Sequence, residues 1–242
     1  MTSHEQPGST LAGKVATSKH RSASLWAAAL LAACGASVAR ASGLDPVVKP
    51  TVAGMAAAHR ALVTGGELGS SWTQGLAFTP SPSAIPCPSL QPDQSDLVET
   101  GVGGTSFDRG PWLNVTAATR VFATVRQAED SWRDTNAPAL VHCYERSLEG
   151  DGEKLESAKR FAFGSSAQHS AGFRLVMTMA RGPALGKGPA LLLRTYTDVF
   201  ALSSGRTQEL VAFSSFTAPL SHGFEGRIVR QVGERLRSRP TA

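Results

Sequence analysis

ALLLRTYTDVFALSSGRTQELVAFSSF, residues 190–216, is the stretch that decides the fold. It contains two apolar, β-branched runs, residues 190–202 and 206–216, separated by Ser203-Ser204-Gly205. Two such runs around a short glycine-containing break predict a β-hairpin. Because the connection is short, the two strands must pair antiparallel.

Residues 173–180 precede this hairpin and alternate apolar side chains with Arg174, Val176 and Thr178, which predicts a third strand. Residues 113–125 are rich in β-branched side chains and predict a fourth. The sequence therefore predicts an antiparallel four-stranded sheet.

Helices are predicted at residues 52–62, at 127–136, from Pro138 onward, and at 223–237. In the last of these, Ile228, Val232 and Leu236 recur at helical spacing and form one apolar side. The expected architecture is α+β, a single domain with the helices packed on one face of the sheet.

Composition limits the class of protein. Hydrophobic residues make up 41% of the 242 residues and charged residues 18%, which is typical of globular proteins. The formal net charge of +5 is too small to indicate a nucleic-acid partner, and we expect none.

The N-terminal region predicts export. A basic stretch, Lys14 to Arg21, precedes the apolar run Leu25–Ala33. A run of this length suits the core of a signal peptide and is too short for a membrane-spanning helix.

Two cleavage sites are compatible with this signal. Leu31-Ala32-Ala33-Cys34 resembles a bacterial lipobox, which would place a lipid on Cys34, whereas Ala39-Arg40-Ala41 suits ordinary signal peptidase and a free secreted protein. Exported chains tend to pair their thiols, so a disulfide between Cys87 and Cys143 would leave Cys34 for the lipid. The expected division is a signal peptide at 1–33, a tether at 34–50 and a domain at 51–242.

The sequence contains no HExxH, CxxC or GxSxG motif, and we expect no metal, cofactor or catalytic residue. We expect the glycines of residues 101–104 to form a flexible loop, and Trp112 and Trp132 to lie in the core.

Arg194, Tyr196 and Asp198 are the candidate binding residues, since alternate side chains of a strand point to the same face. Asp198 is polar within an apolar strand. It is expected to be either an exposed or cross-strand-paired carboxylate at the sheet surface or the polar anchor of a ligand cleft.

The chain resembles the extracellular sensor-like domains of actinobacterial serine/threonine kinases and related lipoproteins. The resemblance covers about 180 residues and rests on five pieces, from Leu62-Val63-Thr64 through Trp72, Cys87, Ala137-Pro138 to Cys143, Asp198–Leu202 before Gly205-Arg206, and the C-terminal amphipathic helix. It implies a non-enzymatic domain that binds a small extracytoplasmic ligand. The kinase sensors carry two disulfides, whereas this chain has only two cysteines besides Cys34.

The expected function is that of a lipid-anchored envelope protein on the outer face of the cell membrane with a sensor-like, ligand-binding domain. The alternatives are a structural lipoprotein that contacts another envelope protein and, further removed, a secreted hydrolase.

Overall fold

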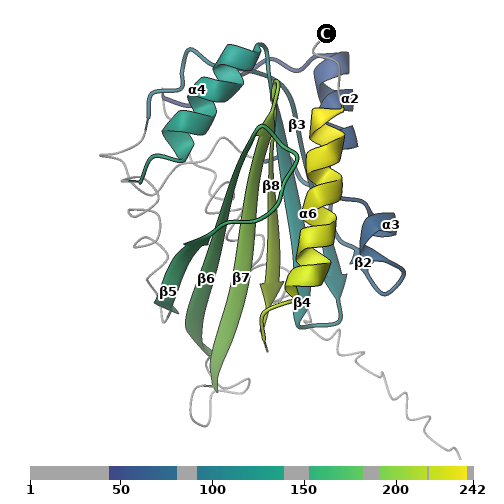
Figure 1. The fold of residues 1–242 in the computed structure, drawn as a ribbon, viewed down its shortest axis with the longest axis vertical. Coiled ribbons are helices and arrows are strands. Elements are labelled where there is room, and N and C mark those ends of the chain that lie inside the picture. Colours follow the sequence, from purple (N-terminus) through teal and green to yellow (C-terminus); the bar gives the residue numbers. More distant parts are fainter. Residues whose placement is uncertain (1–43, 81–91, 139–152, 182–190, 217, 239–242) are drawn as a thin grey trace, which may run out of the picture.

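The computed structural model describes residues 44–80, 92–138, 153–181, 191–216 and 218–238. Figure 1 shows a long twisted sheet with helix α6 lying lengthwise across it. The described elements are, in order, β1 (Val47–Val48), α2 (Val52–Ala61), α3 (Gly65–Leu68), β2 (Thr73–Gln74), β3 (Val98–Arg109), β4 (Leu113–Phe122), α4 (Val125–Thr135), β5 (Glu153–Phe161), β6 (His169–Arg181), β7 (Leu191–Ser204), β8 (Thr207–Ser215) and α6 (His222–Arg237).

Within the described ranges the sheet has eight strands, so the prediction of four was wrong. Its order is β1-β3-β4-β8-β7-β6-β5, with β2 also paired to β3. Every pairing is antiparallel except that of β1 with β3. The predicted hairpin is confirmed as β7–β8, and its turn contains Gly205 at a φ of 57°.

The glycines of residues 101–104 lie in the interior of β3 and not in a flexible loop. Helix α2 lies so close to this strand that a methyl group at Gly101 would be 2.1 Å from the carbonyl oxygen of Gly54. A methyl group at Gly54 would be 2.2 Å from the carbonyl oxygen of Thr100. Glycine at both positions therefore allows helix and strand backbones to touch.

Side-chain caps fix the helix starts. The hydroxyls of Thr51, Thr124 and Ser221 accept hydrogen bonds from the backbone N–H groups of Gly54, Gln127 and Phe224, respectively. Each cap satisfies a donor that has no partner within its own helix.

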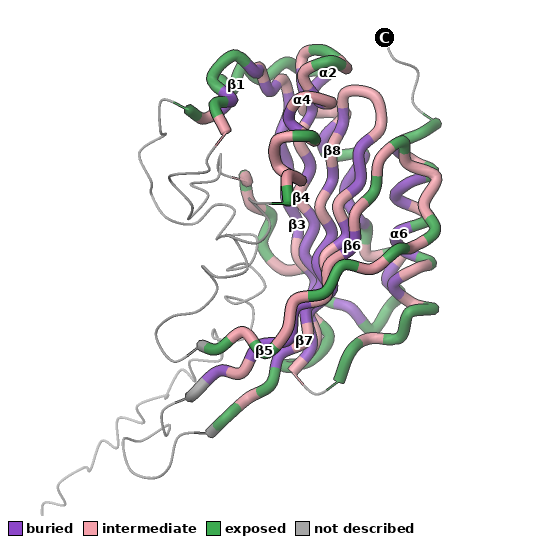
Figure 2. Tube along the Cα trace, turned by 60° about the vertical axis from the view of Figure 1, so that its left-hand side comes forward, coloured by how far each residue is buried: buried purple, intermediate pink, exposed green. Residues whose placement is uncertain are grey.

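The core lies between α6 and the central strands, where buried positions dominate (Figure 2). An aromatic chain runs through it, with Phe200 edge-on to Phe213 and Phe213 edge-on to Phe224 of α6. The core comprises Ala61, Leu62, Val63, Leu68, Trp72, Phe107, Val115, Ala117, Phe200, Leu202, Val211, Phe213, Ile228, Val229, Val232 and Leu236.

The helices do not all pack on one face. Gln208 of β8 donates to the carbonyl oxygen of Ala128 in α4 at 2.6 Å. Side chains alternate along a strand, so Gln208 points away from the face on which Val211 and Phe213 meet α6. Helix α4 therefore contacts the side of the sheet opposite α6.

Leu68 and Trp72 are buried, whereas Trp112 is half-exposed and Trp132 is partly exposed, so neither of the tryptophans predicted for the core belongs to it. The helix predicted from Pro138 onward falls, beyond Pro138 itself, in residues that are not described. Within the described ranges, no helix is both long and apolar enough to cross a bilayer.

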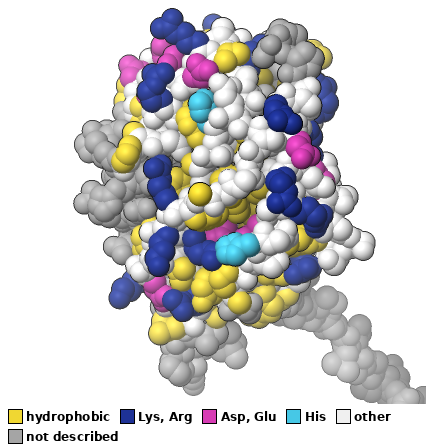
Figure 3. All heavy atoms as spheres, viewed as in Figure 1, with side chains coloured by type: hydrophobic (Ala, Val, Ile, Leu, Met, Phe, Trp, Pro, Cys, Tyr) yellow, Lys and Arg dark blue, Asp and Glu magenta, His cyan; other side chains and the backbone are white. Residues whose placement is uncertain are grey.

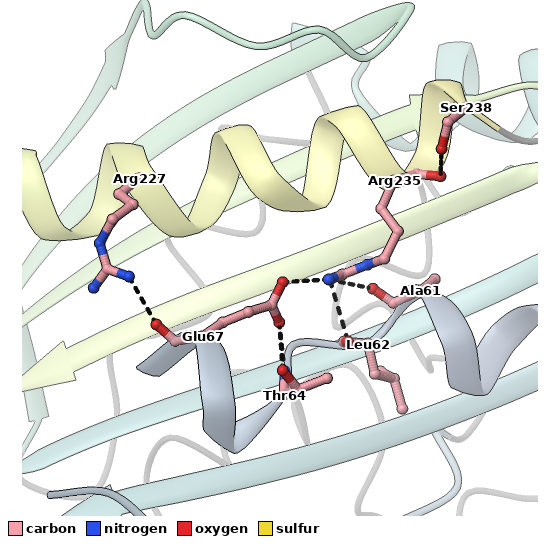
Figure 4. A network of polar contacts seen from close by, with 7 residues as sticks. All are labelled: Ala61, Leu62, Thr64, Glu67, Arg227, Arg235 and Ser238. Atoms are coloured by element: carbon pink, nitrogen blue, oxygen red, sulfur yellow. Dashed lines mark hydrogen bonds and ion pairs between the residues drawn. The ribbon is translucent and has the colours of Figure 1, made fainter. Parts of the chain in front are cut away.

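Arginines of α6 join this helix to the chain around α3 (Figure 4). Arg235 pairs with the carboxylate of Glu67 and donates to the carbonyl oxygens of Ala61 at 2.9 Å and Leu62 at 3.2 Å. Arg227 donates to the carbonyl oxygen of Glu67 at 2.9 Å. These two arginines thus bind backbone carbonyl groups of the protein itself.

Replacing Arg235 with alanine should lower the free energy of unfolding by about 2 kcal/mol, because carbonyl groups at the end of α2 and the Glu67 carboxylate lose a charged donor. Arg235→Lys should recover only part of this loss, since an ammonium group cannot span the three acceptors as a guanidinium does. Urea unfolding measures the effect, with exposed Arg230→Ala as the control. If the Arg235→Ala and Arg230→Ala variants are equally stable, the contacts of Arg235 with Glu67, Ala61 and Leu62 do not stabilise the fold as proposed.

Candidate functional site

A buried ion pair lies at the centre of the sheet face that meets α6. Asp198 of β7 is 2% exposed and stands directly opposite Arg174 of β6. Arg174 Nε donates to Asp198 Oδ1 at 2.6 Å, and its terminal nitrogen donates to Oδ2. This two-pronged contact, above all its hydrogen bonds, raises the pKa of the Arg174 guanidinium, so the arginine remains charged.

A second acid approaches the pair from α6. Glu225 is 1% exposed, and its pKa is raised to about 9, first by burial and then by the charge of Asp198 and a hydrogen bond with it, while the charge of Arg174 opposes the shift. Among the residues that the structure describes, no group donates a hydrogen bond to the carboxyl oxygens of Glu225. Glu225 is therefore protonated at neutral pH and donates its proton to Asp198.

The cluster reaches solvent at its edge. Arg174 is about a quarter exposed, and His222 is 75% exposed with Nδ1 3.7 Å from Glu225 Oε2. Figure 3 shows a histidine and basic side chains near the lower end of α6, with acidic side chains visible between them. A solute at this surface would meet positive and hydrogen-bonding groups before the buried acids.

Beside the cluster, Tyr196 and Arg194 continue the same face of β7. The guanidinium carbon of Arg194 lies 5.4 Å from the centre of the Tyr196 ring. Arg194 also pairs with Glu156 of β5 at 2.5 Å, and the Thr178 hydroxyl donates to Glu156. The Thr178 hydrogen bond is the main reason why the pKa of Glu156 is lowered, with Arg194 adding to it.

Comparisons with known proteins add little to this geometry. No protein-family model and no curated protein matches the chain. Among solved structures, the extracellular domain of PknH from Mycobacterium tuberculosis is similar over 77% of this chain and 98% of that chain, with 11% identity and a TM-score of 0.43. A likeness at this level establishes neither a shared fold nor a shared role.

The predicted trio shares one face of β7, but its members differ in environment. Asp198 is buried and paired across strands with Arg174. Arg194 is more than half exposed, and Tyr196 is partly exposed. Binding of a ligand by these residues stays a prediction.

Sequence reasoning missed Arg174, Glu225 and His222 as members of the site. Glu225 carried a detectable signal, because it precedes Ile228, Val229 and Val232 at the spacing of the apolar stripe of α6. An acid within such a stripe must be buried with a partner or protonated. The partnership of Arg174 with Asp198 required the β6–β7 register, which the strand pattern alone does not supply.

The three cysteines predicted to carry the lipid and the disulfide, Cys34, Cys87 and Cys143, lie outside the described residues. Within the part of the chain that the structure does describe, no group of three or more His, Cys, Asp or Glu side chains is placed to hold a metal ion.

Proposed function

We propose that this chain is an exported, non-catalytic envelope protein, held at the outer face of the cell membrane by a lipid on Cys34, whose domain binds a small ligand. The ligand site of this proposal is the sheet surface formed by Arg174, Arg194 and Tyr196 beside the N-terminal end of α6. The ligand would carry an anionic group together with a planar or apolar part.

The observation that carries the binding site is the arrangement of two partly exposed guanidinium groups near one tyrosine ring. Arg194 stacks over Tyr196, and its ion pair with Glu156 is accessible to water on both sides, with exposed fractions of 56% and 32%. An exposed ion pair is held by about 1 kcal/mol or less, so an anion could replace Glu156 at little cost. The planar ring of Tyr196 offers an apolar surface for the rest of the ligand.

Export and tethering are supported by the sequence. The basic stretch, the apolar run Leu25–Ala33 and the small residues before Cys34 occur in the order of a lipoprotein signal. Two or more acyl chains would hold the domain stably on a bilayer.

Benzoate is a suitable probe of the binding site, because it combines a carboxylate with a planar ring. In a titration followed by ¹H–¹⁵N NMR, we expect the amide signals around Arg194 and Tyr196 to shift first. Arg194→Ala and Tyr196→Ala should each weaken benzoate binding about tenfold, which corresponds to the loss of one charged hydrogen bond or one ring contact.

Arg160→Ala is the matched control. Arg160 is an exposed arginine of β5, the strand on the far side of β6 from β7, and it lies over Phe173, whose side chain points to the opposite face of the sheet. If benzoate shifts no signals on the Tyr196 face, or if Arg160→Ala weakens binding as much as Arg194→Ala, the proposed site is wrong.

A further inference from the structure

The first described segment of the chain, Leu44–Val52, is unusually apolar for an exposed surface. Among the described residues, seven large hydrophobic side chains are exposed, and four of them fall within these nine positions. Val52 is 91% exposed, and Leu44, Val47 and Val48 are each more than a third exposed. We call this stretch the N-terminal apolar segment.

The fold holds this segment in place. The N–H groups of Val47, Lys49 and Thr51 donate to carbonyl oxygens of Leu97, Glu99 and Thr100, at 2.9, 2.8 and 2.8 Å. The Thr51 hydroxyl then caps α2, which starts at Val52. The apolar side chains are thus presented to solvent by a backbone fixed to the edge of the sheet.

The segment also lies at one end of the molecule. Helix α2 is at the upper end in Figures 1 and 2, and β1 is at the upper end in Figure 2, whereas β5 and β7 start at the lower end. The proposed ligand surface beside the N-terminal end of α6 is nearer the lower end, since α6 runs upward to the C-terminus.

The short stretch of chain between Cys34 and Leu44 limits how far the N-terminal apolar segment can be from the proposed lipid. Leu44 is ten residues after Cys34, and ten residues span at most about 36 Å whatever their conformation. A lipid on Cys34 therefore keeps the apolar segment within one bilayer thickness of the membrane surface.

We infer that the N-terminal apolar segment lies on the lipid surface, with Leu44, Val47, Val48 and Val52 among the headgroups and acyl chains. The inference rests on the proposed export and tethering. Exposed Lys49, in the middle of the segment, matches the negative charge of anionic lipids. The domain would then stand upright, with its ligand surface directed away from the bilayer.

The test is a spin label attached to Val52→Cys in the full chain, processed by the cell and reconstituted into vesicles of equal parts phosphatidylcholine and phosphatidylglycerol. Electron paramagnetic resonance compares collisions of the label with oxygen, which concentrates in lipid, and with a water-soluble nickel complex. We expect the oxygen-to-nickel ratio at position 52 to be about tenfold that at Leu192→Cys, because apolar side chains of an interfacial segment enter the acyl boundary.

Leu192→Cys is the control, since Leu192 is an exposed leucine at the start of β7, the end of that strand farthest from β1 and α2. The unsubstituted protein, labelled in parallel, reports any signal from the native cysteines. Equal, water-like ratios at both positions would overturn the inference. So would a label at position 52 that is immobilised but unreachable by oxygen, which indicates a protein partner or a second copy.

The mass of the processed protein separates this inference from the proposed tether. An unlipidated protein whose label at position 52 still enters added vesicles would refute the lipid on Cys34 and retain the surface contact. A lipidated protein whose label at position 52 stays in water would support the lipid on Cys34 and refute the contact of the apolar segment with the membrane.

Discussion

Glu225→Gln should remove most of the alkaline loss of stability of this protein. The pKa of Glu225 is about 9 in the folded protein against an ordinary value of 4.5. Between these values the folded chain holds a proton that the unfolded chain has released. The free energy of unfolding must therefore fall as pH rises, by up to about 1.4 kcal/mol per pH unit.

The glutamine variant has no proton to lose at this position, and its amide can donate to Asp198 as the protonated acid does. We compare the free energy of unfolding of the variant with that of the unsubstituted protein at each pH. We expect this difference to move in favour of the variant by roughly 2–4 kcal/mol between pH 5 and pH 8. Urea unfolding at a series of pH values measures this, with the fluorescence of buried Trp72, which stacks on Phe224, as the signal.

Glu234→Gln is the matched control, because Glu234 is an exposed acid of the same helix. Other groups also titrate, such as Asp134, the pKa of which is raised by burial. These groups are common to all variants, so their contributions to the pH dependence of stability cancel in the comparison. Parallel pH profiles of the Glu225→Gln variant and the unsubstituted protein would show that Glu225 is ionised in the folded state, contrary to the shared proton.

Gly101→Ala should destabilise the protein strongly although it adds a single methyl group. That methyl group would lie 2.1 Å from the carbonyl oxygen and 2.2 Å from the carbonyl carbon of Gly54. Both are backbone atoms, which no rotamer change can move, so α2 must shift away from β3. We expect a loss of about 3 kcal/mol or more in the free energy of unfolding.

Gly223→Ala is the matched comparison, because we expect no loss of stability at a glycine with open surroundings. Apart from its own helix backbone and chain neighbours, no described atom lies within 4 Å of the position that its methyl group would take, and the residue is in α6. Alanine should be neutral or stabilise the helix by up to about 1 kcal/mol. Thermal unfolding of both variants checks the pair, and a Gly101→Ala protein as stable as the parent would contradict the close approach of α2.

Local patterns predicted the elements whose periodicity is simple. Alternation in β6 and β7, the Gly205 turn and the apolar stripe of α6 all correspond to observed structure. Strand β3 was missed because a run rich in glycine is typical of a loop. In β3 these glycines allow close contact with α2 rather than flexibility.

Strand β5 was missed for a different reason. Its sequence, EKLESAKRF, carries charges throughout, which suits the edge of a sheet, where one side of the strand has no partner strand. Its bulge between Leu155 and Ser157 also breaks the alternation that identifies strands.

The candidate site was predicted in part. Alternation placed Arg194, Tyr196 and Asp198 on one face, but burial of Asp198 depends on Arg174 and on α6, which are distant in sequence. The proton shared by Glu225 and Asp198 depends on the packing of α6 against β6 and β7. No local sequence pattern predicts such packing.

The central claim is that this domain is exported and tethered through Cys34. Intact-mass spectrometry of the protein purified from membranes of an expressing bacterium tests it most directly. The account predicts a chain that begins at Cys34, carries the added mass of a diacylglyceryl group and further acyl chain, and lacks two hydrogens for a Cys87–Cys143 disulfide. A chain that begins at Met1, with no added mass and three free thiols, would contradict it.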